Sequence, residues 1–172
     1  ERFLLKSQQG EWNLDNSTKV SVDIDEQQAF VAAHCWLQEQ SSICLDEDIN
    51  VGEKGEAQLS IHQFNFEQLA AFIPQGTQVE GEVNAQAKAK WAPNAKPEVE
   101  LMLSMQKGQV SGLPDAPLVV GWDSITIDAA LANDQLNANW LLDFTDNGEV
   151  SGDIMLPNIQ QLDNGLEGNV RI

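Results

Sequence analysis

Few side chains in this sequence are placed to do chemistry. Asp23 and Asp25 lie two residues apart, on one face of a predicted strand, but glycoside hydrolysis needs such a pair inside a cleft and we place these on an outer face. The acidic run at 46–48 lacks the glycine and distal glutamate of an EF-hand loop, which favours a solvated turn over a calcium site. The two histidines, His34 and His62, have no Cys, His or Asp cluster around them. With no Gly-x-Ser-x-Gly motif and no phosphate-binding loop, we expect neither enzymatic activity nor a cofactor.

The two cysteines offer a different chemistry, which is covalent crosslinking. Cys35 and Cys44 flank a segment that reads as strand, polar turn and strand, and pairing them is symmetric about the turn at 39–40. The side chains would face each other across a hairpin, which permits a disulfide and indicates an oxidising compartment. The alternative is two free thiols in a cytosolic protein. Because the same pairing sets Trp36 opposite Ile43 on the other face, we predict that the disulfide lies outside and clamps the rim.

The charge of the chain excludes several classes of partner. Its 27 acidic and 9 basic residues give a formal net charge of −18, which disfavours nucleic acid and charge-driven docking on an anionic membrane. We interpret this charge as a means of keeping an apolar-lined protein soluble. No apolar run approaches the ~18 residues of a membrane-spanning helix, and the residue pattern leads us to expect no signal peptide within these residues. Both ends read as interrupted strands, so we interpret residues 1–172 as a single segment of a longer chain.

The elements that would position these residues are strands, because apolar and polar residues alternate with a period of two. The longest run spans residues 79–91, and turn signals such as Asn147-Gly148 and Asn164-Gly165 separate later runs. The pattern predicts an all-β fold with a long, mainly antiparallel sheet that has one apolar face and one wet face. A change of parity before Ile125 predicts a bulge near Asp123-Ser124.

One short helix is expected at 66–73. Asn65 can cap its first turn, Gln68 completes an Asn-x-x-Gln capping box, and Pro74 and Gly76 end it. A helix of this length needs tertiary contacts to persist, and we expect it to plug one end of the sheet.

Weak internal repeats accompany the strands. Residues 79–83 resemble 166–170, and residues 108–112 resemble 148–152. Each repeat places a glycine on the inward face, where the missing side chain allows a bend or a close approach of neighbouring parts of the chain.

Alternation also predicts which side chains share the inner, apolar surface. A closed, dry sandwich core would show the same alternation as an open groove, so the residues alone leave both possible. The predicted lining residues are Val20, Val22, Ile24, Phe30, Trp36, Leu59, Ile61, Val83, Leu101, Leu103, Met105, Ile125, Ile127, Leu136, Trp140, Leu142, Phe144, Val150 and Ile154.

Two groups of residues resemble a known family. The first is Cys35-Trp36 with Ile43-Cys44-Leu45. The second is Phe66-x-x-Leu69, Pro74, Val79-x-Gly81-x-Val83 and Trp91-x-Pro93. Together they are similar to the AsmA-related TamB family, near its C-terminal region. The resemblance implies a chain anchored in the inner membrane of a Gram-negative bacterium and extended through the periplasm. It also implies a β-taco, which is a long sheet folded into an open trough with an apolar interior.

The resemblance favours the open groove over the closed core. It implies phospholipid transport between inner and outer membrane, and a linked role in the assembly of outer-membrane proteins and autotransporters with the partner TamA. We expect this segment to lack the family's membrane anchor and the far C-terminal region that would meet TamA, so contact with TamA is expected elsewhere in the full-length protein. We expect phospholipid acyl chains to occupy the groove passively. The alternatives are chaperone-like holding of unfolded outer-membrane strands by β-augmentation, and a closed structural or adhesive module.

Overall fold

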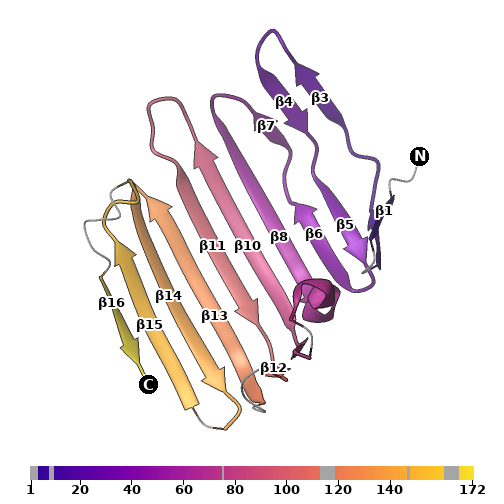
Figure 1. The fold of residues 1–172 in the computed structure, drawn as a ribbon. Coiled ribbons are helices and arrows are strands. Elements are labelled where there is room, and N and C mark those ends of the chain that lie inside the picture. The colour runs from indigo at the N-terminus through magenta and orange to yellow at the C-terminus, as the bar shows by residue number, and fades with distance from the viewer. Residues whose placement is uncertain (1–3, 8–9, 75, 113–118, 147, 161–166) are drawn as a thin grey trace.

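Antiparallel strands make up nearly all of the regular structure in the computed structural model, which describes residues 4–7, 10–74, 76–112, 119–146, 148–160 and 167–172 (Figure 1). The strands are β1 (Leu4–Ser7), β2 (Gly10–Leu14), β3 (Val20–Asp23), β4 (Gln28–Val31), β5 (His34–Gln38), β6 (Ser41–Leu45), β7 (Ile49–Val51), β8 (Gly55–Asn65), β9 (Gln78–Glu80), β10 (Glu82–Trp91), β11 (Glu98–Met105), β12 (Gly108–Ser111), β13 (Val120–Ala132), β14 (Gln135–Phe144), β15 (Gly148–Leu156) and β16 (Glu167–Arg171). One 3-10 helix, η1 (Phe66–Phe72), follows β8. The predicted all-β class is confirmed.

One large sheet dominates the molecule. Its strands lie in the order β1-β2-β5-β6-β8-β10-β11-β13-β14-β15-β16, and β12 and β9 extend it from β13. Every pair is antiparallel, as the hairpin pattern predicts. Strands β14, β15 and β16 pair in sequence, although the turn residues Asn147 and Asn164-Gly165, and Leu166 of one repeat, lie outside the described residues. Among the described strands, β1 and β16 end the sheet, which is therefore open.

The register gives this main sheet two chemically different faces. Residues paired across neighbouring strands share a face, and one such row is Val83, Met105, Ile125, Leu142 and Val150. We call the side on which these residues lie the apolar face. One row on the other side, which we call the polar face, is Gln86, Met102, Asp128, Asn139 and Asp153.

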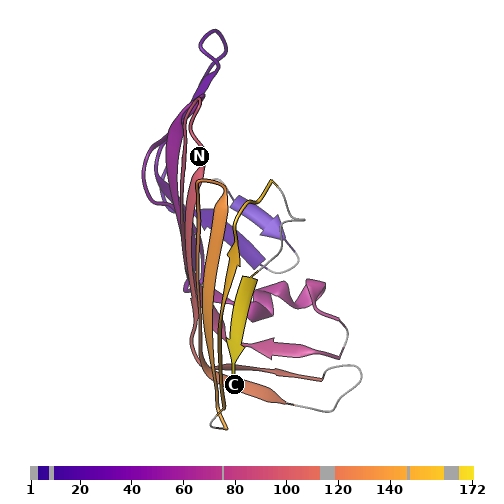
Figure 2. The same ribbon diagram turned by 90° about the vertical axis from the view of Figure 1, so that its left-hand side faces the viewer.

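The helix η1 lies on the apolar side of the sheet. Ser41 alternates with Ile43 in β6 and so shares the apolar face, and Gln68 of η1 donates a hydrogen bond from Nε2 to Ser41 Oγ (3.0 Å). Figure 2 shows η1 and the short strands β9 and β12 projecting from one side of the sheet. The structure describes no second sheet layer facing these elements. Curling of the sheet into a complete trough stays a prediction.

The short helix differs from its prediction in detail. Asn65 does cap it, because Asn65 Oδ1 accepts a hydrogen bond from the backbone N–H of Glu67 (2.8 Å). The conformation is 3-10, and Gln68 reaches Ser41 in β6 instead of closing a capping box on Asn65. The tertiary contact with β6 therefore outcompetes the local one.

Two bulges adjust the register. The predicted one is confirmed, since the pairing of β13 with β14 shifts between Trp122 and Ser124. The second, in β8, was not predicted. There Gln63 has a positive φ of 48°, and its N–H is satisfied by Asn84 Oδ1 at 3.0 Å.

Three of the predicted lining residues lie in a second, three-stranded sheet, and a fourth lies in the turn between two of its strands. Strands β3, β4 and β7 form it, and Ile24 lies in the turn between β3 and β4. Val20 and Val22 pair with Val31 and Ala29, whereas Phe30 pairs with Ser21 and lies on the other face. Because they lie in this second sheet or its turn, Val20, Val22, Ile24 and Phe30 are not part of the apolar face of the main sheet, to which Trp36 belongs.

The second sheet exists because three neighbouring stretches of extended chain are each interrupted at the same level. The breaks fall at 15–19, 32–33 and 46–48, where the main-sheet strands β2, β5 and β6 meet β3, β4 and β7. Aspartate side chains accept the hydrogen bonds that the ladder leaves there: Asp48 from Ala33 N–H (2.8 Å), and Asp15 from Cys35 N–H (3.1 Å). Sequence analysis placed a solvated turn at 46–48, but the alternation pattern did not predict that the strands would also break at 15–19 and 32–33, at the same level of the sheet.

Candidate functional site

An uninterrupted row of apolar residues crosses the main sheet perpendicular to its strands. Each member is the direct cross-strand neighbour of the next, from β5 to β16. At about 4.8 Å between neighbouring strands, the eight steps of this row cover about 38 Å. We call it the central row, and it consists of Trp36, Ile43, Ile61, Ala85, Leu103, Ile127, Trp140, Gly152 and Val170.

Parallel rows flank the central row on the same face. One is the row of Val83, Met105, Ile125, Leu142 and Val150, and the other includes Leu59, Leu101 and Ile154. The structure thus brings together, on one face, fifteen of the predicted lining residues: Trp36, Leu59, Ile61, Val83, Leu101, Leu103, Met105, Ile125, Ile127, Leu136, Trp140, Leu142, Phe144, Val150 and Ile154.

Most of this apolar face is only half-buried. Among the described residues, five hydrophobic side chains are buried, and of the predicted lining residues only Val83 (9% exposed) is one of them. Leu59 is 48% exposed. A sandwich core would bury both faces of such a row under a second sheet, and the described residues supply none. The face is therefore an open surface and not a dry core.

Sequence reasoning missed several aromatic members of the apolar face. Trp12 of β2 stacks on Phe64 of β8 with ring centroids 6.3 Å apart, and Phe64 pairs with Val83. The alternation Trp12-x-Leu14 was a signal that could have found the first. No alternation signal could have found Phe64, because the bulge at Gln63 reverses its parity relative to Ile61.

The charged groups of the sheet lie on its polar face. Lys88 Nζ lies 2.9 Å from Glu56 Oε1, and Lys90 Nζ lies 3.5 Å from the same oxygen. The hydrogen bond from Lys88 lowers the pKa of Glu56, and the same bond raises the pKa of Lys88. Both side chains are partly exposed, so this pair orders side chains on the outside of the sheet and places no charge in the central row.

The disulfide is confirmed and lies on the polar face. Cys35 and Cys44 are bonded, with Cα atoms 4.0 Å apart, and Cys44 pairs onward with Ser60. Trp36 and Ile43 pair on the opposite face, as predicted. The crosslink thus braces the β5–β6 hairpin beside the break at Asp15 without entering the apolar face.

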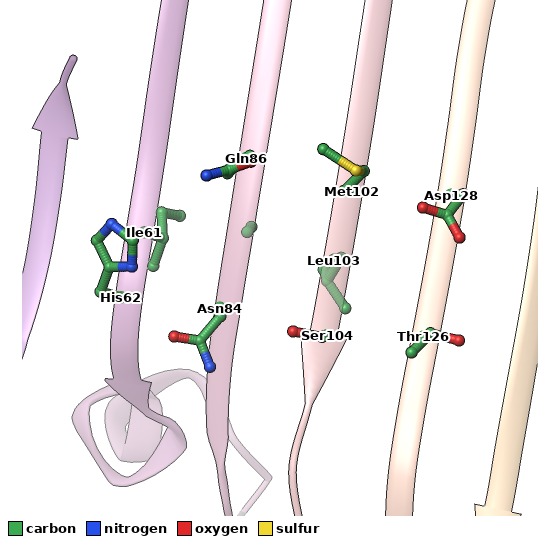
Figure 3. Close-up of a pocket in the computed structure, with 10 residues that line it drawn as sticks. Ile61, His62, Asn84, Gln86, Met102, Leu103, Ser104, Thr126 and Asp128 are labelled. Carbon is green, nitrogen blue, oxygen red and sulfur yellow. The ribbon is translucent and has the colours of Figure 1, made fainter.

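A shallow hollow of about 250 Å³ lies on the polar face (Figure 3). Its polar lining includes His62, Asn84, Gln86 and Asp128. These polar side chains are on the opposite side of the sheet from those of the central row, although the central-row residues Ile61, Ala85 and Leu103 also line the hollow. The described residues contain no group of three or more possible metal ligands, there or elsewhere.

The other candidate groups have structural roles. His34 Nδ1 lies 2.9 Å from the carbonyl oxygen of Ala32, at the break between β4 and β5. Asp46 accepts a hydrogen bond from Ser60 Oγ at 2.6 Å, and Asp23 accepts two backbone N–H groups in the β3–β4 turn. In the described part of the chain, no helix has the length and hydropathy needed to cross a membrane.

Comparison with known proteins identifies the family of this chain. A family model described as "TamB, N-terminal domain" matches residues 1–172, whereas no solved structure matches the chain. The expected position near the C-terminal region of the family is therefore wrong. Alternating strands recur along a repetitive chain, so loose motifs in one stretch identify the family without locating the stretch within it. TamB proteins belong to the bacterial cell envelope and work with TamA. The chain belongs to the TamB family and has a role in the translocation and assembly module.

Proposed function

We propose that the apolar face lines part of a groove that conducts phospholipid acyl chains between the inner and outer membranes, without catalysing a reaction. The observation that carries this proposal is the central row, which is apolar across nine successive strands and open to solvent. Exposed apolar patches of more than a few hundred Å² usually mark binding surfaces. In the intact protein this face would form the apolar interior of a trough.

The chemistry of the row suits an occupant that has to move. Burial of an acyl chain contributes about 0.8 kcal/mol per methylene and has no directional preference. The central row carries no charged side chain that would hold a lipid at one position. An acyl chain can therefore be bound along its whole length and still slide, while its headgroup stays in water at the open edge.

The remaining features fit a periplasmic protein. The Cys35–Cys44 disulfide requires an oxidising compartment, such as the periplasm. The net charge of −18 opposes binding to anionic lipid headgroups through charge, which leaves acyl chains as the recognised part of the lipid. We propose that inner-membrane anchoring and contact with TamA reside in other parts of the full-length protein.

The test compares two arginine substitutions on adjacent residues of β11. Leu103 belongs to the central row, and Met102 is 53% exposed on the polar face. A photo-crosslinking amino acid at Ile127, the cross-strand neighbour of Leu103, would report on phospholipid in cells grown with radiolabelled phosphate. Leu103→Arg places an ionised group in an apolar site at a cost of several kcal/mol, so we expect it to abolish the phospholipid crosslink and the function of the full-length protein.

Met102→Arg is the matched control, and it should keep both the phospholipid crosslink and the function of the full-length protein. Val83→Asp is a poorer choice, because Val83 is buried next to Phe64 and its loss would disturb folding. The proposal fails if the unsubstituted protein with the probe at Ile127 captures no phospholipid, or if Leu103→Arg behaves like Met102→Arg.

A second candidate function is holding of unfolded outer-membrane strands by β-augmentation. All five residues of β16 are exposed, and among the described strands β16 pairs only with β15. A crosslinker at Asn169 would capture client protein if this edge accepts strands, and protein adducts there without phospholipid at Ile127 would favour this function.

A further inference from the structure

Three tryptophans of the apolar face share one arrangement. Trp91, Trp122 and Trp140 are each paired directly across the sheet with a glycine, which is Gly55, Gly108 and Gly152 respectively. A Cβ atom built on these glycines would lie 2.3, 2.5 and 2.2 Å from Cζ2 of the paired indole. Real Cβ atoms do not approach a ring carbon so closely. Each indole therefore lies down over the bare backbone of its glycine partner instead of standing upright on the sheet.

Trp140 differs from the other two in its position. Trp91 and Trp122 lie at strand ends, and their indole N–H groups donate to the carbonyl oxygens of Gly52 (3.0 Å) and Gln106 (2.9 Å). Such bonds hold the two rings at the margins of the face. Trp140 lies within the central row, between Ile127 and Gly152. It lies on β14, whose neighbour β15 carries the glycine (Figure 1).

The orientation of the Trp140 indole decides how far side-chain atoms extend above the sheet at this point of the central row. Lying over Gly152, the ring presents its flat side and adds apolar contact area. A side chain at position 152 would occupy the space of the ring and lift it from the sheet. The bicyclic ring is larger than any aliphatic neighbour in the row, so a lifted ring would obstruct the space in which an acyl chain would lie.

We propose that Gly152 is a positioning residue that keeps the Trp140 indole flat and thereby keeps the central row passable for a saturated or unsaturated acyl chain. This inference rests on the proposed function, because it concerns the same apolar face. Gly152 acts only through Trp140 and needs no contact with the lipid.

The test uses Gly152→Ala in the full-length protein, with the photo-crosslinking residue at Ile154, two residues along β15 on the same face. Loss of burial equivalent to one methylene, ~0.8 kcal/mol, corresponds to about a fourfold loss of occupancy. We expect Gly152→Ala to lower phospholipid crosslinking by about fourfold or more. Gly148→Ala is the matched control. It lies on the same strand and face, and its Cβ would meet Phe144 at an ordinary 3.8 Å, so crosslinking should not change.

A double variant separates obstruction from loss of stability. The Cβ introduced at position 152 would also meet the backbone oxygen of Asn169, at 2.7 Å, and this contact is common to Gly152→Ala and to Trp140→Ala/Gly152→Ala. Removing the ring should restore crosslinking although the protein becomes no more stable. A purely structural role for the glycine predicts that the double variant loses at least as much crosslinking as Gly152→Ala.

The outcomes distinguish this inference from the proposed function. If the otherwise unsubstituted protein gives no phospholipid crosslink at Ile127 or Ile154, the groove itself is refuted. If it does, and Gly152→Ala crosslinks normally or the double variant is not rescued, the role of Gly152 is refuted and the groove stands.

Discussion

Removal of the Cys35–Cys44 disulfide tests how the β5–β6 hairpin is held beside the strand breaks. The bond joins residues nine apart, so it closes a loop of ten residues. In the chain-entropy description, closing such a loop removes ~9 cal/mol/K from the open chain, or about 2.7 kcal/mol at 25 °C. The variant Cys35→Ala/Cys44→Ala is therefore expected to lower the local opening free energy of this hairpin by up to about 2.7 kcal/mol. Alanine is a better replacement than serine, because Cys44 is only 7% exposed and a hydroxyl group there would be buried.

Hydrogen exchange followed by mass spectrometry measures this quantity in the intact protein. A loss of about 2.7 kcal/mol corresponds to exchange that is up to roughly 100-fold faster, in peptides covering residues 34–45. Peptides covering residues 82–105, in the middle of the sheet, should exchange as before. Reductant should accelerate exchange in the unsubstituted protein and leave the double variant unchanged.

Two results would refute this reasoning. One is unchanged exchange at residues 34–45 in the unsubstituted protein after reductant treatment, when thiol labelling shows that both cysteines are reduced. The other is a loss of phospholipid crosslinking at Ile127 in the double variant, because the disulfide lies on the polar face and should not affect the apolar face.

Two further predictions concern the polar face. Ser60 is 2% exposed, and its Oγ donates a hydrogen bond to Asp46 Oδ1 at 2.6 Å. Ser60→Ala should therefore destabilise the β6–β8 pairing by about 1–3 kcal/mol in the same exchange experiment. A larger loss of opening free energy in Asp46→Asn, which keeps an acceptor oxygen, would contradict the assignment of Ser60 as the donor. Lys88→Gln should raise the pKa of Glu56 towards its ordinary value in an NMR titration, while Lys96→Gln should leave it alone. Because the pKa of Glu56 is lowered in the folded protein, the small contribution of this pair is present above the ordinary pKa of a glutamate and is lost as the pH falls through the lowered value.

Local patterns were sufficient for the features that depend on near neighbours in the chain. The disulfide and the opposition of Trp36 to Ile43 follow from one hairpin, whose register is determined by a short turn. The bulge at Asp123 was visible as a change of parity within β13. These features needed no knowledge of which distant strands meet.

The failures share one physical cause, which is competition from partners remote in sequence. Gln68 was predicted to bond Asn65 three residues away, yet it bonds Ser41, 27 residues away. Phe64 joined the apolar face only because Gln63 bulges against Asn84 of the next strand. Phe30 left the predicted surface because strand pairing breaks at Ala32 and Ala33, whose N–H groups donate to the carbonyl oxygen of Lys19 and to Asp48 Oδ1 respectively.

The sequence by itself determined that this protein is a two-faced antiparallel sheet with a disulfide on its polar side, because period-two alternation and hairpin turns act within one strand or between adjacent ones. Only the tertiary structure decided that the apolar residues of nine strands align in one row, that no second described layer covers them, and that Trp140 lies flat over Gly152. These properties depend on the register between strands and on the packing against a bare backbone, which no single strand encodes.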